Sequence, residues 1–473
     1  MALDPRLPVL VGVAAVSDHD GAAEAVDLME AAAREALGGA SGLGPAVDEV
    51  LVPEGSWRYR DPGRLLASRL CATARTVRAD VGVLQQTLVT GAARDIAEGR
   101  ADVILVCGGE ARARAAAATR RGEEAPETAG GEAPPGEVLR PAGEIITGLE
   151  IERGLAVPAH QYAVIDNALA AVEGVPADEH RRQLGRLWAD FSAVAASNPD
   201  AWDRDPRTPG EITTPGPGNR MIAEPYTKLL CSQWNVNQAA ALVLCSVEAA
   251  RRHRVATDSW VFPVSAAESN AMVPLPARRD LHRSPGFALA GRRALELAGT
   301  SIDDVDHLDL YSCFPAAVRV QLREIGVPAG RPLTVTGGMT FAGGPLNNYV
   351  LQATARLASL LRGRPASTGV VTAVSGMLTK QAVAVWSSEP PAAFRSAEVG
   401  DEVLAATATC PVVDEPDGMG RVAGWTVVHE GAVPALAVVL VDLPSGARTV
   451  ATAPPDAPEV GAPVRVRGGR ASR

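Results

Sequence analysis

The sequence predicts a duplicated α/β fold followed by a small all-β domain. Two observations predict it. Strand-like runs alternate with alanine-rich helical runs over most of the chain, and one order of residues recurs at a constant offset. Such alternation favours a largely parallel sheet covered by helices. The 473 residues are enough for about two to four domains of ordinary size.

The first α/β stretch starts at the N-terminus. Its predicted elements are a strand at Val9–Val13, a helix over Ala22–Leu37, a strand at Val47–Val52, a helix that includes Ala92–Glu98 and a strand at Val103–Val106. The last of these strands ends at two glycines, Gly108 and Gly109, which favour a break in regular structure.

A segment of different character interrupts this pattern over Arg112–Met221. Its part Ala125–Pro141 is rich in Glu, Gly and Pro and predicts a loop. A helical and polar pattern follows from Glu144 to Trp202, and Asp203–Arg220 is again rich in Pro and Gly. We interpret the segment as an insertion between strands, because a strand that runs into a helix returns at Gln238–Ala250.

The second α/β stretch, from Trp260 to about Glu389, repeats the first. At an offset of 258, Arg34, Ala36, Leu37, Val47 and Asp48 recur as Arg292, Ala294, Leu295, Val305 and Asp306. Because the matches keep the order of helix and strand, we predict an internal duplication. From Ala393, short β-prone runs at Trp425–Val428, Ala437–Val441 and Val464–Val466 predict a small barrel.

Composition excludes several classes of function. The net charge of −10 argues against a nucleic-acid or anionic-membrane surface, since both need clustered positive charge. Six cysteines without a CxxC pair argue against a disulfide scaffold or a zinc ribbon, and the scattered histidines predict no metal site. The N-terminus lacks a signal-peptide pattern and no run of 18 apolar residues occurs, so we expect a cytoplasmic protein.

Four segments resemble motifs of the thiolase superfamily in their family order. They are Ala101–Glu110 (ADVILVCGGE), Asn237–Ala250 (NQAAALVLCSVEAA), Leu310–Phe314 (LYSCF) and Ala342–Asn348 (AGGPLNN). The run Pro225–Lys228, the triplet Leu378–Lys380 and the β-rich tail are most similar to actinobacterial thiolase-like proteins of type 1. The resemblance covers about Pro8 to Pro390.

The resemblance implies a fold of five layers, α-β-α-β-α, in which the inserted segment is a loop domain that holds coenzyme A. It implies an N-terminal half at 1–255 with an insertion at about 112–221, a C-terminal half at 256–391 and an additional β domain at 392–473. Thiolases use a Cys nucleophile, a His that activates it and a second Cys that moves a proton.

The chain departs from this catalytic set at every position. The nucleophile falls near Gly82, and no Cys lies between residues 72 and 106. Gly344-Pro345 stands where the family has its GHP histidine, and Tyr311 replaces a His or Asn. The last motif, Ala373–Gln381, has neither Cys nor His. Because such residues act as a unit, we expect no thiolase or acetyl-CoA acetyltransferase activity.

Other polar residues remain candidates at the same place. In the thiolase fold two helices begin near Gln85–Thr87 and Asn347, so these residues either contact a ligand or cap the helices. Tyr311 is a candidate acid or oxyanion donor, or else fills the space of the lost His. Cys313 is a candidate ligand contact or a small buried apolar residue.

Three further positions have two interpretations each. Lys380 and Gln381 stand near the lost second Cys, as candidate catalytic residues or as partners of a loop. His160 in the insertion is a candidate ligand contact or a structural residue. Trp234 lies where the family presents small residues to the pantetheine, so it either blocks the tunnel or stacks on a ligand.

Two functions follow from these expectations. The first is a protein that binds an acyl-CoA or lipid-like ligand without a covalently bound cofactor and without thiolase chemistry. The second is an acyl-CoA enzyme with rebuilt chemistry, a retro-aldolase or another acyltransferase that uses Tyr311. The resemblance also implies a monomer whose C-terminal β domain covers the sheet edge by which thiolases pair, and a small OB-fold or hydratase-like protein as a candidate partner.

Overall fold

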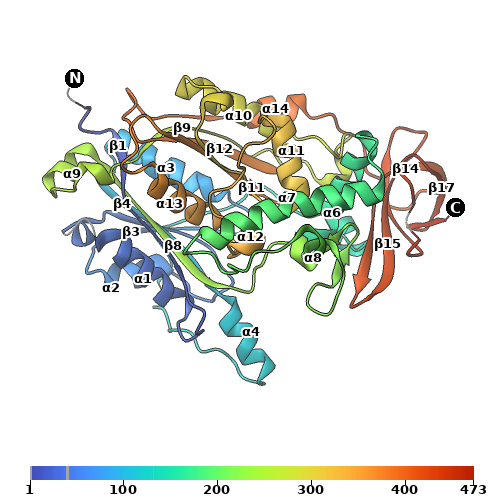
Figure 1. Cartoon of the computed structure of the whole chain (residues 1–473), viewed down its shortest axis with the longest axis horizontal. Helices are drawn as coiled ribbons and strands as arrows, with labels where there is room; N and C mark the ends of the chain where they lie inside the picture. The colour runs from blue at the N-terminus through green and yellow to red at the C-terminus, as the bar shows by residue number, and fades with distance from the viewer. Residues whose placement is uncertain (1–2, 39–41, 132, 457, 473) are drawn as a thin grey trace.

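The computed structural model describes residues 3–38, 42–131, 133–456 and 458–472. Its main body has five layers (Figure 1). The outer helices are α1 (Ala25–Gly38) and α2 (Pro62–Arg69) on one face, and α10 (Pro285–Ala298) and α11 (Pro315–Ile325) on the other. Two helices, α3 (Gln85–Ala97) and α13 (Tyr349–Leu361), lie between the two sheets.

The first sheet contains six strands. Their spatial order is β1 (Pro8–Ser17), β8 (Asn237–Ser246), β4 (Val103–Ala111), β2 (Glu49–Pro53), β3 (Arg75–Ala79) and β5 (Glu137–Leu139). β8 runs antiparallel to both β1 and β4, and the pairs from β4 to β5 are parallel.

The second sheet contains five strands and repeats this arrangement. Their order is β10 (His307–Asp309), β11 (Thr368–Ser375), β12 (Lys380–Ser387), β9 (Phe262–Ser269) and β13 (Arg395–Glu398). Strands β9, β12, β11 and β10 match β1, β8, β4 and β2 in order and in relative direction. The predicted duplication is therefore confirmed strand by strand.

The sheets are mixed, so the expectation of a largely parallel sheet is wrong. One strand in each half, β8 in the first and β12 in the second, runs antiparallel to both of its neighbours. In the second half the reason is local, because β11 and β12 are joined by only the four residues Gly376–Thr379. A connection of that length permits a hairpin, whereas a parallel crossover needs about a dozen residues or more.

Burial patterns explain the positions of the helices. α1 has one buried stripe, Val26, Met29, Ala33 and Leu37, at the spacing of a helix with one exposed face. α13 is buried almost all round, from Tyr349 through Leu361, which fits a helix enclosed between two sheets. The central pair therefore points two helix N-termini at the same side of the molecule.

The inserted segment is mainly helical, as predicted. It contains α4 (Arg112–Arg120), α5 (Gly148–Glu152), α6 (Pro158–Val172), α7 (Ala177–Ser197) and α8 (Pro209–Thr213). The predicted loop at Ala125–Pro141 nevertheless contains β5, which pairs with the outer edge of β3. Gly136 N donates to Thr76 Oγ1 at 3.1 Å beside this pairing, so tertiary contacts order a strand too short to predict from its sequence.

The C-terminal strands form a closed barrel, as expected. Its order is β15 (Val433–Asp442), β16 (Arg448–Ala453), β18 (Arg470–Ser472), β17 (Pro463–Arg467) and β14 (Gly418–Glu430), and β14 pairs with β15 to close it. The barrel packs against α6 and lies at the far end of the molecule from β3 (Figure 1). The edge of β3 is thus covered by β5 and not by the β domain.

Two elements that lie beyond residue 391, and thus inside the range expected for the β domain, belong to the second half of the fold. β13 pairs with β9 in the second sheet, and α14 (Gly400–Ala406) packs on α10. β14, the first strand of the barrel, starts only at Gly418. Among the residues that the structure describes, no helix has the length and apolar character needed to cross a membrane.

Candidate functional site

A cavity of about 1490 Å³ lies where the two halves meet the inserted segment. The first half contributes the turn before α3, and the second half contributes the end of β11 and the segments after β10 and before α13. The insertion closes the other side. Residues used below that line the cavity are Gly82, Gln85, Tyr162, Lys228, Cys231, Trp234, Tyr311, Cys313, Asn347 and Ser375.

Two helix N-termini meet at the inner end of this cavity, as predicted. Gln85 in the first turn of α3 accepts a hydrogen bond from Val350 N in the first turn of α13, at 2.7 Å. Its Nε2 donates to Asn347 Oδ1 at 3.3 Å. Gln85 therefore caps the opposite helix, and the Nδ2 of Asn347 has no partner within the described chain.

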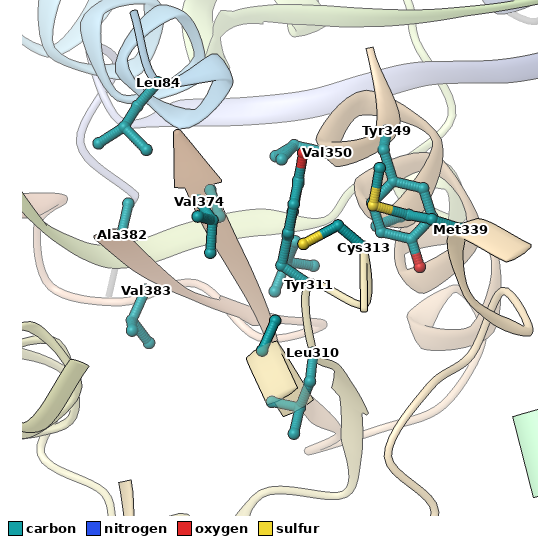
Figure 2. Close-up of a cluster of buried hydrophobic side chains, with 14 of the residues drawn as sticks. Leu84, Leu310, Tyr311, Cys313, Met339, Tyr349, Val350, Val374, Ala382 and Val383 are labelled. Atoms are coloured by element: carbon teal, nitrogen blue, oxygen red, sulfur yellow. The ribbon is translucent and has the colours of Figure 1, made fainter. Parts of the chain in front are cut away.

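Tyr311 stands beside these termini. Figure 2 shows its hydroxyl pointing toward Val350. Burial raises the pKa of the Tyr311 hydroxyl far above its ordinary value, the Cys313 thiol adds to this, and the Gln85 side chain lowers it. The phenol is therefore neutral at physiological pH, so it can donate a hydrogen bond to a ligand oxygen.

Hydrogen bonds from two elements, β11 and α11, hold the backbone of Tyr311. Its N–H donates to Thr372 Oγ1 at 2.7 Å, and its carbonyl accepts from Gln321 Nε2 at 2.8 Å. The ring meets that of Tyr349 edge to face, with centroids 5.7 Å apart. The position of the hydroxyl is thus fixed by packing before any ligand binds.

Two cysteines line the cavity. Burial raises the pKa of the Cys313 thiol to about 12, and burial raises the pKa of Cys231 well above the ordinary range. The Cys231 thiol donates to Thr227 O at 3.4 Å, at the start of a short 3₁₀ turn that follows the insertion. Because the thiolate is the nucleophile, neutral thiols of this kind are chemically inert.

Gly82 forms part of the wall between α3 and the insertion. Its φ is +105°, and a Cβ placed on it would lie 2.9 Å from Ile145 Cδ1 and 3.1 Å from Pro141 Cγ. Its carbonyl accepts from Lys380 Nζ at 2.8 Å and from Ser375 Oγ at 3.0 Å. The wall here is therefore closed against a side chain and braced from behind.

Trp234 lies on the cavity wall with 49% of its surface exposed. The guanidinium carbon of Arg112 lies 4.0 Å from the centroid of its ring. This cation–π contact leaves the indole as a flat platform that solvent reaches. The two interpretations of Trp234, a plug and a stacking surface, both stay predictions.

Four sequence-predicted candidates do not lie on the cavity wall. Thr87, two residues beyond Gln85 along α3, donates to Glu268 Oε2 at 2.9 Å. His160 bonds Gly154 O through Nδ1 at 2.8 Å, and burial lowers the pKa of its imidazole. Lys380 lies behind Gly82, and Gln381 donates to Leu378 O. Thr87 and His160 thus each have a hydrogen-bond partner away from the cavity wall, and their two interpretations stay predictions.

Sequence reasoning missed Cys231, Ser375 and the Arg112 partner of Trp234. Cys231 precedes a Ser-Gln-Trp run without any motif, so no signal separates it from a core residue. Arg112 lies 122 positions before Trp234 in the sequence, and only the antiparallel pairing of β4 with β8 brings the two segments together.

Comparison with models of protein families gives no match. Among solved structures, the chain is similar to a monomeric SCP2-thiolase like protein type 1 from Mycobacterium smegmatis, with 29% identity, a TM-score of 0.84 and coverage of 99% of this chain and 100% of that one. It shares the fold of the Ltp2-ChsH2(DUF35) aldolase, with 19% identity, a TM-score of 0.61 and coverage of 80% and 98%.

A curated relative is the acetyl-CoA acetyltransferase of Methanothermobacter thermautotrophicus. The two sequences are 26% identical over 221 residues. The match covers 42% of this chain and spans 57% of that relative's length. The resemblance seen in the sequence motifs is therefore confirmed: the chain has the thiolase fold and is similar over almost its whole length to a thiolase-like protein of type 1.

Proposed function

We propose that this chain binds an acyl-CoA, or a lipid-like ligand of similar shape, and does not catalyse thiolase chemistry. The cavity carries the proposal. It ends at two helix N-termini with an uncommitted amide on Asn347, and its only cysteines within the described wall, Cys231 and Cys313, are neutral thiols.

The inner end of the cavity suits a thioester carbonyl. The N-termini of α3 and α13 each carry about half a positive charge. The Asn347 Nδ2 and the Tyr311 hydroxyl add two neutral donors beside them. A carbonyl oxygen there would accept hydrogen bonds from these donors without any ion pair to break.

The mouth suits the nucleotide end of the same ligand. The indole of Trp234, backed by Arg112, offers a face on which an adenine ring can stack. Arg220 and Lys228 also line the cavity, and cations of this kind bind phosphate oxygens. Support also comes from the curated relative, whose name includes acetyl-CoA.

Titration calorimetry with acetyl-CoA tests this proposal. Removal of one base-stacking side chain costs about 1–3 kcal/mol, so Trp234→Ala should weaken binding by about tenfold or more. Val433→Ala is the matched control, because Val433 is 64% exposed on the barrel, away from the cavity. Equal affinity of the wild type and Trp234→Ala for acetyl-CoA would refute the stacking role of Trp234. Absence of binding to the wild type would refute the proposal that the chain binds an acyl-CoA.

A second candidate function is carbon–carbon bond cleavage of a 3-hydroxyacyl-CoA with Tyr311 as the acid. Its support is the shared fold of the aldolase and the fixed, neutral phenol at the inner end of the cavity. The test is a turnover assay with 3-hydroxyacyl-CoA substrates. Turnover that falls about 100-fold in Tyr311→Phe would support this function, and turnover unchanged by that substitution would remove Tyr311 from the reaction.

The expected monomer and partner remain predictions. The pairing of β5 with the β3 edge supports a monomer, as does the similarity to a monomeric protein from M. smegmatis. The small OB-fold or hydratase-like partner is supported only by the name of the similar aldolase, because that name joins two components. A cytoplasmic location is likewise part of the proposal.

A further inference from the structure

The chain contains only two lysines among its 45 basic side chains; the others are arginines. They are Lys228 and Lys380. Lys228 is exposed and lines the cavity, and Lys380 is 2% exposed directly behind the cavity wall. Both lysine side chains therefore lie at the same cavity, one on its wall and one behind it.

The environment of Lys380 is unusual for a cation. Within the described residues, its Nζ has one hydrogen-bond partner, the carbonyl of Gly82 at 2.8 Å. Burial lowers the pKa of this amine, and no neighbouring charge contributes to the shift. A buried amine without a carboxylate partner is costly in its charged form, so it is poised to lose its proton.

One residue, Gly82, separates the Lys380 amine from the cavity. Its hydrogen-bond partner Gly82 lines the cavity. Lys380 also pairs across β11 and β12 with Ser375, which lines the cavity too. The side chain of Lys380 thus reaches the cavity wall from behind, at the place where the wall has no side chain of its own.

A purely structural role does not require a lysine. Elsewhere this chain braces buried carbonyl groups with arginine. Arg278 donates to Val273 O at 3.0 Å and to Met377 O at 2.8 Å, and Arg362 donates to Val11 O at 3.0 Å. A guanidinium cannot lose its proton in a protein, whereas an amine can and then becomes a nucleophile. Lys380, unlike Arg278 and Arg362, can therefore lose its proton and become a nucleophile.

We propose that Lys380 is a reactive amine that forms an imine with the ketone or aldehyde carbonyl of a ligand in this cavity. The lone pair of the neutral amine attacks the carbonyl carbon and a C–N bond forms. The two amine protons pass to the carbonyl oxygen, the C–O bond breaks, and the oxygen leaves as water. No oxidant or reductant is needed. The inference deepens the proposed function, because it names a keto or aldehyde group on the acyl chain as the feature recognised.

Reductive trapping tests this inference directly. The native protein is incubated with acetylacetone or with acetoacetyl-CoA in the presence of cyanoborohydride, which reduces an imine to a stable secondary amine. Peptide mass mapping then assigns the label, and the chain offers only Lys380, Lys228 and the N-terminal amine as sites. Each unit by which its pKa is lowered increases the neutral fraction of an amine about tenfold at neutral pH.

We expect Lys380 to be labelled faster than Lys228. Lys380→Arg should keep the hydrogen bond to Gly82 and abolish this label, and Lys228→Arg is the matched control that should leave it unchanged. Label on Lys228 and none on Lys380 in the wild-type protein would overturn the inference, whether or not the Lys380→Arg variant folds.

The two probes separate this inference from the proposed function. Acetylacetone has no nucleotide, so its reaction with Lys380 does not depend on CoA recognition. Label from acetylacetone without calorimetric binding of acetoacetyl-CoA would retain the reactive amine and reject the CoA ligand. Binding of acetoacetyl-CoA without label from either probe would retain the ligand and reject the reactive amine.

Discussion

Substitution of Gly82 by alanine tests whether the cavity wall excludes a side chain at this position. The added Cβ would lie 2.9 Å from Ile145 Cδ1 and 3.1 Å from Pro141 Cγ, on a residue whose φ is +105°. Backbone strain of this kind costs about 1–3 kcal/mol, and overpacking costs about 1–3 kcal/mol. We therefore expect Gly82→Ala to lower the free energy of unfolding by about 2–6 kcal/mol.

The matched control is Gly299→Ala. Gly299 ends α10 with a φ of +68°, and a Cβ there would meet nothing within 4 Å. This variant measures backbone strain alone, at about 1 kcal/mol. The difference between the two variants in urea denaturation is then the cost of packing against Ile145 and Pro141, and Ile145→Ala in the Gly82→Ala background should recover part of it.

Gly82→Cys extends the test to chemistry. The structure predicts that a cysteine placed at this position lacks room for attack, so thiolysis of acetoacetyl-CoA should stay at background. Gly82→Ala no less stable than Gly299→Ala would refute the reasoning on packing. Thiolysis by Gly82→Cys would refute the claim that a cysteine at position 82 lacks room to attack.

Three further predictions concern the site, the sheet edge and a buried charge. Tyr311→Phe should weaken acetyl-CoA binding by at most about 1–2 kcal/mol in calorimetry, the value of one hydrogen bond. Val138→Pro should break the pairing of β5 with β3, so light scattering should show species near twice 49.0 kDa, because an open edge invites pairing; a persistent monomer would contradict this. Burial raises the pKa of Asp166, but Arg319, His180 and Tyr226 overcome this and lower it overall. The ionised Asp166 therefore stabilises the fold above the pKa of about 3.9 that it has in the unfolded chain, and this stabilisation is lost as the pH falls below that value. Asp166→Asn should make the free energy of unfolding less dependent on pH in the acid range.

Local patterns in the sequence predict the duplication well. The apolar stripe of α1 and its repeat in α10 follow from helical spacing, and Asp48 and Asp306 keep their places ahead of equivalent strands. β5 could not be predicted, because its three residues are ordered by β3 alone and its flanks are rich in Gly and Pro.

The candidate site could be predicted only in part. Gln85, Tyr311 and Asn347 lie on the cavity wall because they follow or precede elements whose order the motifs fix. Arg112 begins the inserted segment and Cys231 follows it, so both reach the site through a path of the chain that no local pattern specifies. Thr87 shows why the role of a single residue could not be predicted from the sequence. It lies two positions after Gln85 along α3, so its side chain faces Glu268 and not the cavity.

Calorimetric titration of the wild-type protein with acetyl-CoA, combined with an assay of free CoA release in the same samples, tests the central claim most directly. We expect saturable binding with one ligand per chain and no release of CoA above the rate without protein. Absence of binding, or catalytic release of CoA, would contradict a thiolase fold that keeps its ligand cavity without its nucleophile.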